Sequence, residues 1–438
     1  MSFEFGNALS RLNKLHKFGI KLGLENIRDI LAALENPHHS YPSILVAGTN
    51  GKGSVTAYLS SIMQSAGLKV GRYTSPHLSS FTERININGN DVDRMQAARI
   101  LNYVLDKADK IGLIGKTSRS LTYFEAATAG ALLYFAEEEI DLAVLEVGMG
   151  GRFDATNICD PVLSLITVVE MDHMQYLGNT LEEIAFEKAG IFRAGIPAIV
   201  EKSTFISNKV LKDQANKVGA DAWFMDKQIK VISNRDDNLE FDLIAPIGEL
   251  KNLKPGLFGD FQIRNAAIAA AAAMRINSMG NIKIPDVAIR EGLAAAKWPG
   301  RFEILIGTPA IILDGGHNPH AVQAFSDSLK RYFKDKKSVG VIGIMADKEV
   351  VGMVKIFANL FKKVFAAAPN VERSLDPNIL AEYFRNERVD AVSCDSISSA
   401  IDSAIKEVGP NGLVVVAGSL YLVGEARIYL GLAEGDPI

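Results

Sequence analysis

The stretch ILVAGTNGKGS, residues 44–54, limits the fold of this chain more than any other segment. An apolar strand pattern changes into a turn with three glycines, and a helical pattern follows from Gly53. Glycines let the backbone approach an anion, and N–H groups at the start of the next helix point at phosphate oxygens. The order strand, turn, helix therefore predicts a phosphate-binding loop, with Lys52 neutralising phosphate charge and Ser54 binding Mg²⁺.

The loop departs from the common nucleotide-binding pattern G-x-x-x-x-G-K-[ST]. Val46 stands where the first glycine should be, and Gly53 separates Lys52 from Ser54. A glycine-rich turn with an incidental lysine is the alternative interpretation of the same residues.

Elsewhere, apolar strand-like runs alternate with helical patterns, which is typical of a parallel sheet covered by helices on both faces. The linker KWPGRFE, residues 297–303, separates two such series. We therefore predict an α/β protein with an N-terminal P-loop-type parallel-sheet ATPase domain, residues 1–297, and a smaller Rossmann-like α/β domain, residues 298–438. The first 40 residues are typical of an amphipathic helix, and residues 227–247 of antiparallel strands. Strands are expected at 44–47, 69–73, 142–147, 162–168, 198–200, 311–313, 339–344, 364–367 and 413–416, and helices from 53 and at 122–138, 181–189, 262–275, 286–296, 320–333, 349–361 and 397–407.

The overall charge and the cysteine content exclude several classes of function. The net charge of the 438 residues is -4, so there is no basic excess for a nucleic-acid partner. The two cysteines, Cys159 and Cys394, have neither disulfide-framework nor zinc-site spacing, which favours a reducing compartment. We found neither a signal-peptide pattern nor an apolar run long enough to span a bilayer. We expect a cytoplasmic, monomeric protein with no membrane partner.

Three polar residues follow predicted strands. Ser75, Glu146 and His173 lie near the carboxyl ends of three strands, and these ends line one edge of a parallel sheet. A hydroxyl, a carboxylate and an imidazole at that edge could hold a divalent cation, although Mg²⁺ prefers oxygen ligands. The alternative is that Glu146 caps a helix and His173 only bonds Asp172.

A glycine-rich segment follows Glu146. Gly148, Gly150 and Gly151 precede Arg152, and Asp154 lies just beyond. Such a segment is either a mobile loop over a cleft or a plain turn.

Several segments together resemble one known enzyme family. The loop GTNGKGS is similar to that of ligases that form amides with amino acids, which are the Mur ligases and the related folylpolyglutamate and dihydrofolate synthases. The folate enzymes are the better match, chiefly through SPHL, TYFE and the segment that follows Glu146. The matching segments, in the order of the family, are YTSPHLSSFTERI (73–85), LTYFEAATAGAL (121–132), EVGMGGRFDATN (146–157), DHMQYLGNTLEEIAFEKAGIF (172–192), GDFQIRNAAIAA (259–270), GRFE (300–303) and LDGGHNPHA (313–321).

The resemblance implies an ATP-dependent ligase that joins L-glutamate to 7,8-dihydropteroate, giving dihydrofolate, and to the glutamate tail of reduced folates. ATP would activate the acceptor carboxylate as an acyl phosphate, which the amine of glutamate would attack. Mg²⁺, expected as two ions, and K⁺ are the implied cations, and Lys188 matches a lysine that the family carries as N6-carboxylysine. The family shows alanine where Gly316 stands, which is a mild departure that would loosen the turn.

The resemblance also assigns roles to individual positions. Without the resemblance, we would interpret Phe124 as a core residue and His317 and Ser419 as structural residues. Lys188 would extend its charge to solvent or pair with Glu183 or Glu187. The implied residues are Asn50, Gly51, Lys52, Gly53, Ser54, Asn265, Arg301 and Asp314 for ATP; Ser54, Ser75, Glu146 and His173 for metal; Thr122, Phe124, Arg152 and Asp154 for the pterin; His317 and Ser419 for glutamate; and Lys52, Lys188, His173 and His317 for catalysis.

Three alternatives stay open. The segment LTYFE favours the bifunctional type of enzyme, but a folylpolyglutamate synthase without dihydrofolate synthase activity fits most of the same motifs. A Mur-type peptidoglycan ligase would need a further domain before residue 40, where we expect no room for one. A switch protein that hydrolyses ATP without ligation would show no dependence on folate or glutamate.

Overall fold

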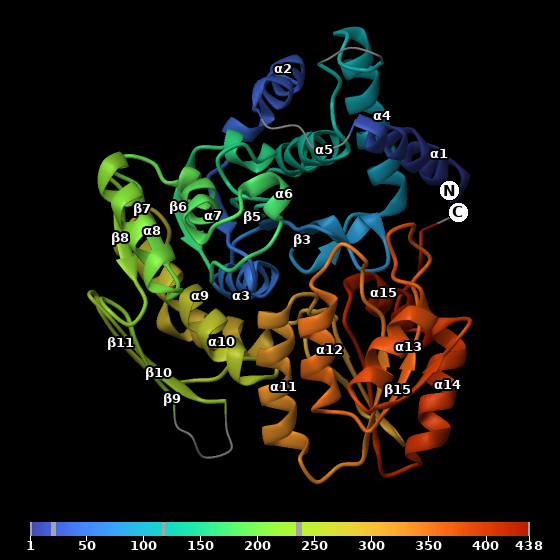
Figure 1. Ribbon diagram of the computed structural model, residues 1–438. Coiled ribbons are helices and arrows are strands. Elements are labelled where there is room, and N and C mark those ends of the chain that lie inside the picture. The colour runs from blue at the N-terminus through green and yellow to red at the C-terminus, as the bar shows by residue number, and fades with distance from the viewer. Residues whose placement is uncertain (1, 19–22, 116–118, 234–238, 437–438) are drawn as a thin grey trace.

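The computed structural model describes residues 2–18, 23–115, 119–233 and 239–436. Within these ranges the chain builds two large sheets, each covered by helices on both faces, and a small three-stranded sheet (Figure 1). The predicted α/β class is confirmed. The boundary between residues 297 and 298 stays a prediction, and hydrophobic clusters that are separate for the two large sheets support it.

The larger sheet is built on the strand that enters the glycine-rich turn. In the described part of the chain it has eight strands in the order β4-β3-β2-β5-β1-β6-β7-β8. The strands from β2 to β8 in this order are parallel, whereas β3 and β4 are antiparallel additions at one edge, so the sheet is mixed rather than purely parallel as predicted. The bounds are β1 Ser43–Ala47, β2 Val70–Tyr73, β3 Ile85–Ile87, β4 Asn90–Asp91, β5 Leu142–Glu146, β6 Pro161–Ile166, β7 Pro197–Val200 and β8 Asp221–Phe224.

The alternation of side chains along β1 assigns the two faces of this sheet. Leu45 and Ala47 pack into one hydrophobic cluster, and Ile44 and Val46 into the other, as the two-residue period of a strand requires. Helices α3 (Lys52–Ser65), α9 (Asp260–Ser278) and α10 (Asp286–Ala295) cover the Ile44 face. The Leu45 face is covered by α1 (Ser2–Asn13), α2 (Glu25–Ala33), α4 (Arg94–Lys110), α5 (Tyr123–Glu137), α6 (Met174–Leu177), α7 (Leu181–Lys188) and α8 (Phe205–Val218).

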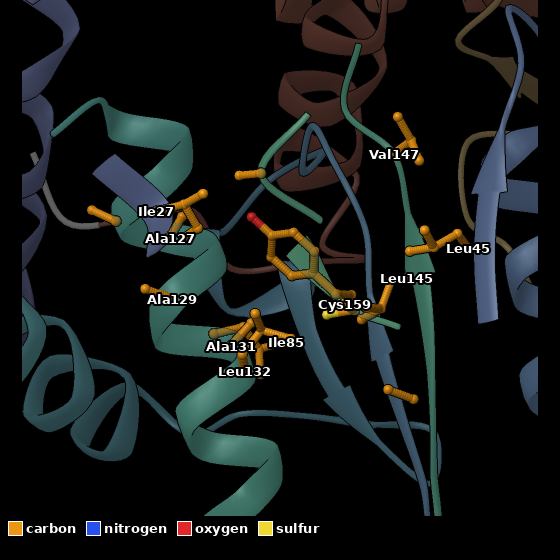
Figure 2. Packing of buried hydrophobic residues seen from close by; sticks show 14 of the residues in the cluster. Ile27, Leu45, Ile85, Ala127, Ala129, Ala131, Leu132, Leu145, Val147 and Cys159 are labelled. Atoms are coloured by element: carbon orange, nitrogen blue, oxygen red, sulfur yellow. The ribbon is translucent and has the colours of Figure 1, made fainter. Parts of the chain in front are cut away.

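Helix α5 lies close to the sheet because its buried face carries small side chains. Ala127, Ala129 and Ala131 of this helix belong to the same cluster as Leu145 of strand β5 (Figure 2). The helix begins at a capping box, in which the Thr122 hydroxyl accepts from the Glu125 backbone N–H and the Glu125 carboxylate accepts from the Thr122 N–H. This cap fixes the helix start beside the carboxyl ends of the strands.

The first 40 residues form two helices, α1 and α2, rather than the single helix that was expected. Residues 19–22, between them, lie outside the described residues. The antiparallel strands predicted within 227–247 are confirmed, except that residues 234–238 of this range lie outside the description. Their bounds are β9 Lys230–Ser233, β10 Phe241–Ala245 and β11 Gly248–Leu253.

The C-terminal sheet has the order β12-β13-β17-β14-β15-β16, and it is parallel except for β12. Helices α11 (Pro319–Phe333), α12 (Val350–Ala358) and α13 (Pro377–Asn386) cover one face, and α14 (Ile397–Val408) and α15 (Leu420–Tyr429) the other. Helix α11 meets α9 where the two halves of the molecule join (Figure 1). The strands are β12 Glu303–Leu305, β13 Ala310–Asp314, β14 Ser338–Ile342, β15 Lys363–Ala366, β16 Asp390–Ser393 and β17 Leu413–Ala417.

Shorter 3-10 turns cover Lys14–Phe18, Pro37–His39, Phe81–Arg84, Ala155–Ile158 and Ala189–Ile191. No helix in the described ranges has both the length and the apolar character needed to span a membrane.

Candidate active site

The glycine-rich turn lies between β1 and α3, as the sequence predicts. Gly51 precedes the helix with φ +90°, and a Cβ there would come within 2.6 Å of the Asn265 side-chain oxygen. Only glycine therefore fits between this turn and α9 without strain. The turn keeps the backbone N–H groups at the start of α3 available for an anion, which is the geometry of a phosphate loop.

Two ammonium groups meet beneath this loop. Lys52 Nζ donates to the carbonyl oxygens of Gly48 and Thr49, at 3.2 Å each, and Lys188 Nζ donates to the same Gly48 oxygen at 2.8 Å. Burial, together with the neighbouring Lys52 charge, lowers the pKa of Lys188 to about 7. A substantial fraction of Lys188 is therefore neutral at physiological pH.

The proposed metal ligands gather at the carboxyl ends of β2 and β5. The backbone N–H of Ser75 donates to Glu146 Oε2 at 3.4 Å, and His173 lines the same cavity. Burial raises the pKa of Glu146, although Lys52 and Arg301 oppose the shift. For His173, burial lowers the pKa to about 4, so its imidazole is neutral at pH 7 and has a lone pair. A buried carboxylate beside a hydroxyl fits Mg²⁺, and His173 remains the unusual ligand of the set.

Among the described residues, no group of three or more His, Cys, Asp and Glu side chains could hold a metal by itself. Glu146 is therefore the one carboxylate of the predicted ligand set, and phosphate oxygens would have to supply further ligands.

The C-terminal half contributes a second set of groups across the junction. Asp314, at the end of β13, accepts from the backbone N–H groups of Phe302 and Gly316 at 2.9 Å each. Burial raises the pKa of Asp314, and the nearby Arg301 opposes the shift. Burial lowers the pKa of His317 to about 4, and its Nδ1 lies 3.0 Å from the Gly315 carbonyl oxygen.

Direct contacts tie the two halves together at this point. The amide groups of Asn50 and Asn318 exchange two hydrogen bonds, at 3.1 and 2.9 Å. Lys348 Nζ donates to Asp172 Oδ1 at 2.9 Å, and both side chains are largely buried. Asn318, the residue before helix α11, therefore touches the phosphate loop. Lys348, in the turn after β14, touches the segment beyond β6.

Three cavities meet at Ser75 and Pro76, which line all of them. The nucleotide-side cavity, about 370 Å³, lies over the phosphate loop. Its lining contains the predicted ATP ligands and metal ligands, namely Asn50, Gly51, Lys52, Gly53, Ser54, Ser75, Glu146, His173, Asn265, Arg301 and Asp314. His317, predicted for glutamate and catalysis, lines it as well.

The loop-side cavity, about 420 Å³, is bordered by the glycine-rich segment after Glu146 and by the start of α5. Thr122, Phe124 and Asp154 line it, as do His317 and Ser419 from the other half. The polar atoms of several of these residues also have local partners. Asp154 accepts from Met149 N–H and from the Thr156 hydroxyl, and Ser419 accepts from Tyr421 N–H.

Arg152 does not lie among the residues that line this cavity. Its guanidinium stacks over the Phe186 ring at 4.2 Å, and its Nε lies 3.6 Å from Glu187 Oε1. The role predicted for Arg152 in pterin binding stays a prediction. Lys188 is also absent from the cavity linings and lies beneath the phosphate loop.

The linker-side cavity, about 560 Å³, extends from the phosphate loop along the segment 295–299. It shares Gly53, Glu146 and Arg301 with the nucleotide-side cavity and contains Arg72 and Trp298 in its wall. The sequence reasoning did not predict this cavity.

Comparisons with known proteins agree with this geometry. Residues 46–273 match the Mur ligase middle domain, and residues 300–420 match the Mur ligase glutamate ligase domain. The dihydrofolate synthase/folylpolyglutamate synthase of Bacillus subtilis is 33% identical, over 98% of this chain and 99% of that protein. The chain belongs to the dihydrofolate synthase/folylpolyglutamate synthase family of Mur ligases.

Solved structures of this family have the same fold. Escherichia coli FolC in complex with DHPP and ADP superposes with a TM-score of 0.88 at 32% identity, covering 98% of this chain and 97% of that one. A bifunctional enzyme of Yersinia pestis, complexed with AMPPNP and Mn ion, superposes with a TM-score of 0.85 at 31% identity, covering 98% of each chain.

A further relative is longer than this chain. The probable bifunctional folylpolyglutamate synthase/dihydropteroate synthase of Halobacterium salinarum is 35% identical over 97% of this chain, but the match covers 51% of that protein. The chain thus spans about half the length of this relative.

The family resemblance missed several residues of the site. His16, Phe153, Lys348 and Arg373 line the loop-side cavity, and Arg72 lines the linker-side cavity. Lys348 follows β14, so the rule that ligands bind at strand carboxyl ends could have found it. His16 is stacked on Tyr123, with ring centroids 4.2 Å apart, and only the tertiary structure brings these residues together.

The structure explains why a glycine stands between Lys52 and Ser54, where the common nucleotide-binding pattern has no residue. A Cβ at position 53 would lie 2.8 Å from Trp298 Nε1 and 2.9 Å from Cζ2, so the indole rests directly on the loop. Trp298 precedes Arg301 by three residues and thereby fixes the linker that carries this arginine to the phosphate site.

We predict that Gly53→Ala lowers kcat about 10-fold or more, because the new methyl group displaces the indole and moves Arg301. In a Trp298→Ala background the same substitution should cost much less. Steady-state kinetics of the four proteins of this double-mutant cycle measure the coupling. If the two substitutions have additive effects, Trp298 does not act through the loop.

Proposed function

We propose that this chain is a bifunctional ligase that uses ATP to join L-glutamate to 7,8-dihydropteroate and to the glutamate tail of reduced folates. The observation that carries this proposal is the convergence of the nucleotide-side and loop-side cavities at Ser75, His173 and His317. One cavity has the phosphate loop, and the other has an aromatic side chain, Phe124, that can stack on a flat heterocycle.

Activation of the acceptor takes place where these cavities meet. The acceptor carboxylate attacks the γ-phosphorus of ATP, which forms an acyl phosphate and releases ADP. Lys52 from the loop and Arg301 from the linker neutralise the charge of the transferred group from two sides. A Mg²⁺ ion held by Ser54, Ser75, Glu146 and His173 would add positive charge at the phosphate oxygens.

The amine of glutamate then attacks the acyl carbon, and inorganic phosphate leaves as the amide forms. The carboxylates of glutamate need cations close to this point. Lys348 and Arg373 line the loop-side cavity from the C-terminal half, beside His317 and Ser419. We assign glutamate to this side of the junction. Acyl phosphates hydrolyse in water, so a site closed between two halves protects the intermediate.

We propose further that Lys188 is carboxylated. A neutral amine is the form that adds CO₂, which gives a carbamate anion and releases a proton, and the pKa of Lys188 of about 7 supplies that form. The carbamate would lie beside Lys52, whose positive charge offsets its own.

The proposal includes a cytoplasmic monomer. The two cysteines are free, which suits a reducing compartment. A requirement for K⁺ stays a prediction that exchange of K⁺ for Na⁺ in the assay will test.

We predict that Lys52→Ala lowers ADP release by at least about 100-fold, because the γ-phosphate loses its main cation, while the circular dichroism spectrum stays unchanged. The assay contains ATP, glutamate and either dihydropteroate or tetrahydrofolate, and Lys110→Ala, on the surface of α4, is the control. Release without glutamate would indicate a hydrolysing switch. Release with tetrahydrofolate alone would restrict the enzyme to tail extension.

We also predict that Lys188→Ala lowers turnover by about 100-fold and that propionate or a similar short carboxylate restores part of it, because the anion replaces the carbamate. Lys188→Arg is the matched control, since it keeps a positive charge but cannot add CO₂, and it should be inactive and not rescued. Full activity of the arginine variant would contradict carboxylation.

A further inference from the structure

The linker-side cavity contains a half-buried arginine, Arg72, that the proposed reaction does not yet use. Arg72, on β2, lines this cavity, and its Nε is buried with no hydrogen-bond partner among the described residues. Within those same ranges no carboxylate forms an ion pair with Arg72. Asp91 and Glu146 are near enough to stabilise the Arg72 charge, but they do not satisfy the buried Nε, and a ligand in the cavity could supply an acceptor to the guanidinium.

Other arginines of the same cavity already have partners. Arg94 lies 3.3 Å from Glu434 and donates to the Gly435 carbonyl oxygen at 2.7 Å. Arg427 binds Glu303 and the Leu432 carbonyl oxygen. Arg301 faces the nucleotide-side cavity as well, where the proposed mechanism uses it. Arg72 thus differs from these side chains, because its Nε has no hydrogen-bond partner among the described residues and the proposed mechanism does not use it.

The Arg72 side chain is held in place before any ligand arrives. Its guanidinium carbon lies 4.9 Å from the ring centroid of Trp298, at a cation–π distance, and the indole in turn rests on Gly53. A guanidinium fixed in this way loses little conformational entropy when it binds a carboxylate.

Strand register places Arg72 next to the reaction centre. Arg72 pairs with Val144 in the β2–β5 ladder, and Glu146 lies two residues further along β5. Because side chains alternate along a strand, Arg72 and Glu146 point to the same face of the sheet, and both line the linker-side cavity. An anion bound by Arg72 would therefore lie on the same side of the sheet as the position proposed for the acceptor carboxylate beside Glu146.

The two proposed acceptors differ at this point. Dihydropteroate ends in a single carboxylate. A folate ends in a glutamate that has two carboxylates: the γ-carboxylate reacts, and the α-carboxylate is attached to the α-carbon, two methylene groups from the γ-carboxylate. We propose that the linker-side cavity binds this α-carboxylate through Arg72, so that Arg72 selects acceptors with a glutamate tail. The cavity of about 560 Å³ has room for the inserted glutamyl unit. This inference rests on the proposed bifunctional activity.

The test compares the use of two acceptors by each of three proteins. For wild type, Arg72→Gln and Arg72→Lys, kcat/KM is measured with dihydropteroate and with tetrahydrofolate at saturating ATP and glutamate. In Arg72→Gln we expect the ratio of tetrahydrofolate to dihydropteroate efficiency to fall about 10-fold to 100-fold, chiefly through KM, because a charge-assisted hydrogen bond is lost. Arg72→Lys should recover part of the ratio. Arg99→Gln, on the exposed face of α4, is the control and should not change the ratio.

Thermal melting and a binding measurement separate a local from a global effect. Removal of an unpaired charge should leave the melting temperature of Arg72→Gln at or above that of wild type. Calorimetric titration with tetrahydrofolate triglutamate should show a matching loss of affinity.

An unchanged ratio in a folded Arg72→Gln protein would overturn the assignment. An equal loss with both acceptors, together with weaker product inhibition by inorganic phosphate, would also overturn it and would assign Arg72 to the released phosphate. If wild type does not use one of the acceptors, the proposed function fails before the tail assignment is tested.

Discussion

The close approach of Lys52, Lys188 and Arg301 to the phosphate loop is the constraint on which the rest of the site depends. Lys52 and Lys188 share the carbonyl oxygen of Gly48, and the pKa of Lys188 is lowered to about 7 as a result of burial and of this neighbour. Arg301 approaches from the linker. A triphosphate and an acceptor carboxylate would supply the anions that these cationic groups can bind. The raised pKa of the buried Glu146 fits the same picture, because a carboxylate in this position needs a bound cation.

The phosphate loop is one of the places where the two halves of the molecule touch. Asn50 exchanges hydrogen bonds with Asn318, and Trp298 packs on Gly53. A ligand that changes the loop will therefore change the position of the C-terminal half, and a ligand on the C-terminal half will change the loop. An enzyme that must assemble three substrates and exclude water from an acyl phosphate benefits from this coupling, because closure and activation occur together.

Much of the fold and of the site could be predicted, and the misses have physical reasons. The buried parallel strands β1, β5 and β6 are largely apolar runs, so their pattern is strong, whereas β3 has three residues and β4 two, too few to form such a pattern. Glu146 and Ser75 follow from the rule for strand ends. Arg72 does not, because the sequence VGRY looks the same whether the arginine faces solvent or an internal cavity. The contact of Gly53 with Trp298 joins residues far apart in the chain, and no local pattern indicates it.

The central claim is that one triphosphate binds between the phosphate loop and the linker. A crystal structure with a non-hydrolysable ATP analogue, Mg²⁺ and dihydropteroate tests it most directly. We expect the γ-phosphate to lie between Lys52 and Arg301, with the base in the nucleotide-side cavity near Asn265 and the acceptor carboxylate beside Glu146. A nucleotide bound with Arg301 turned away from its phosphates, or an acceptor whose carboxylate lies far from Glu146, would contradict the account.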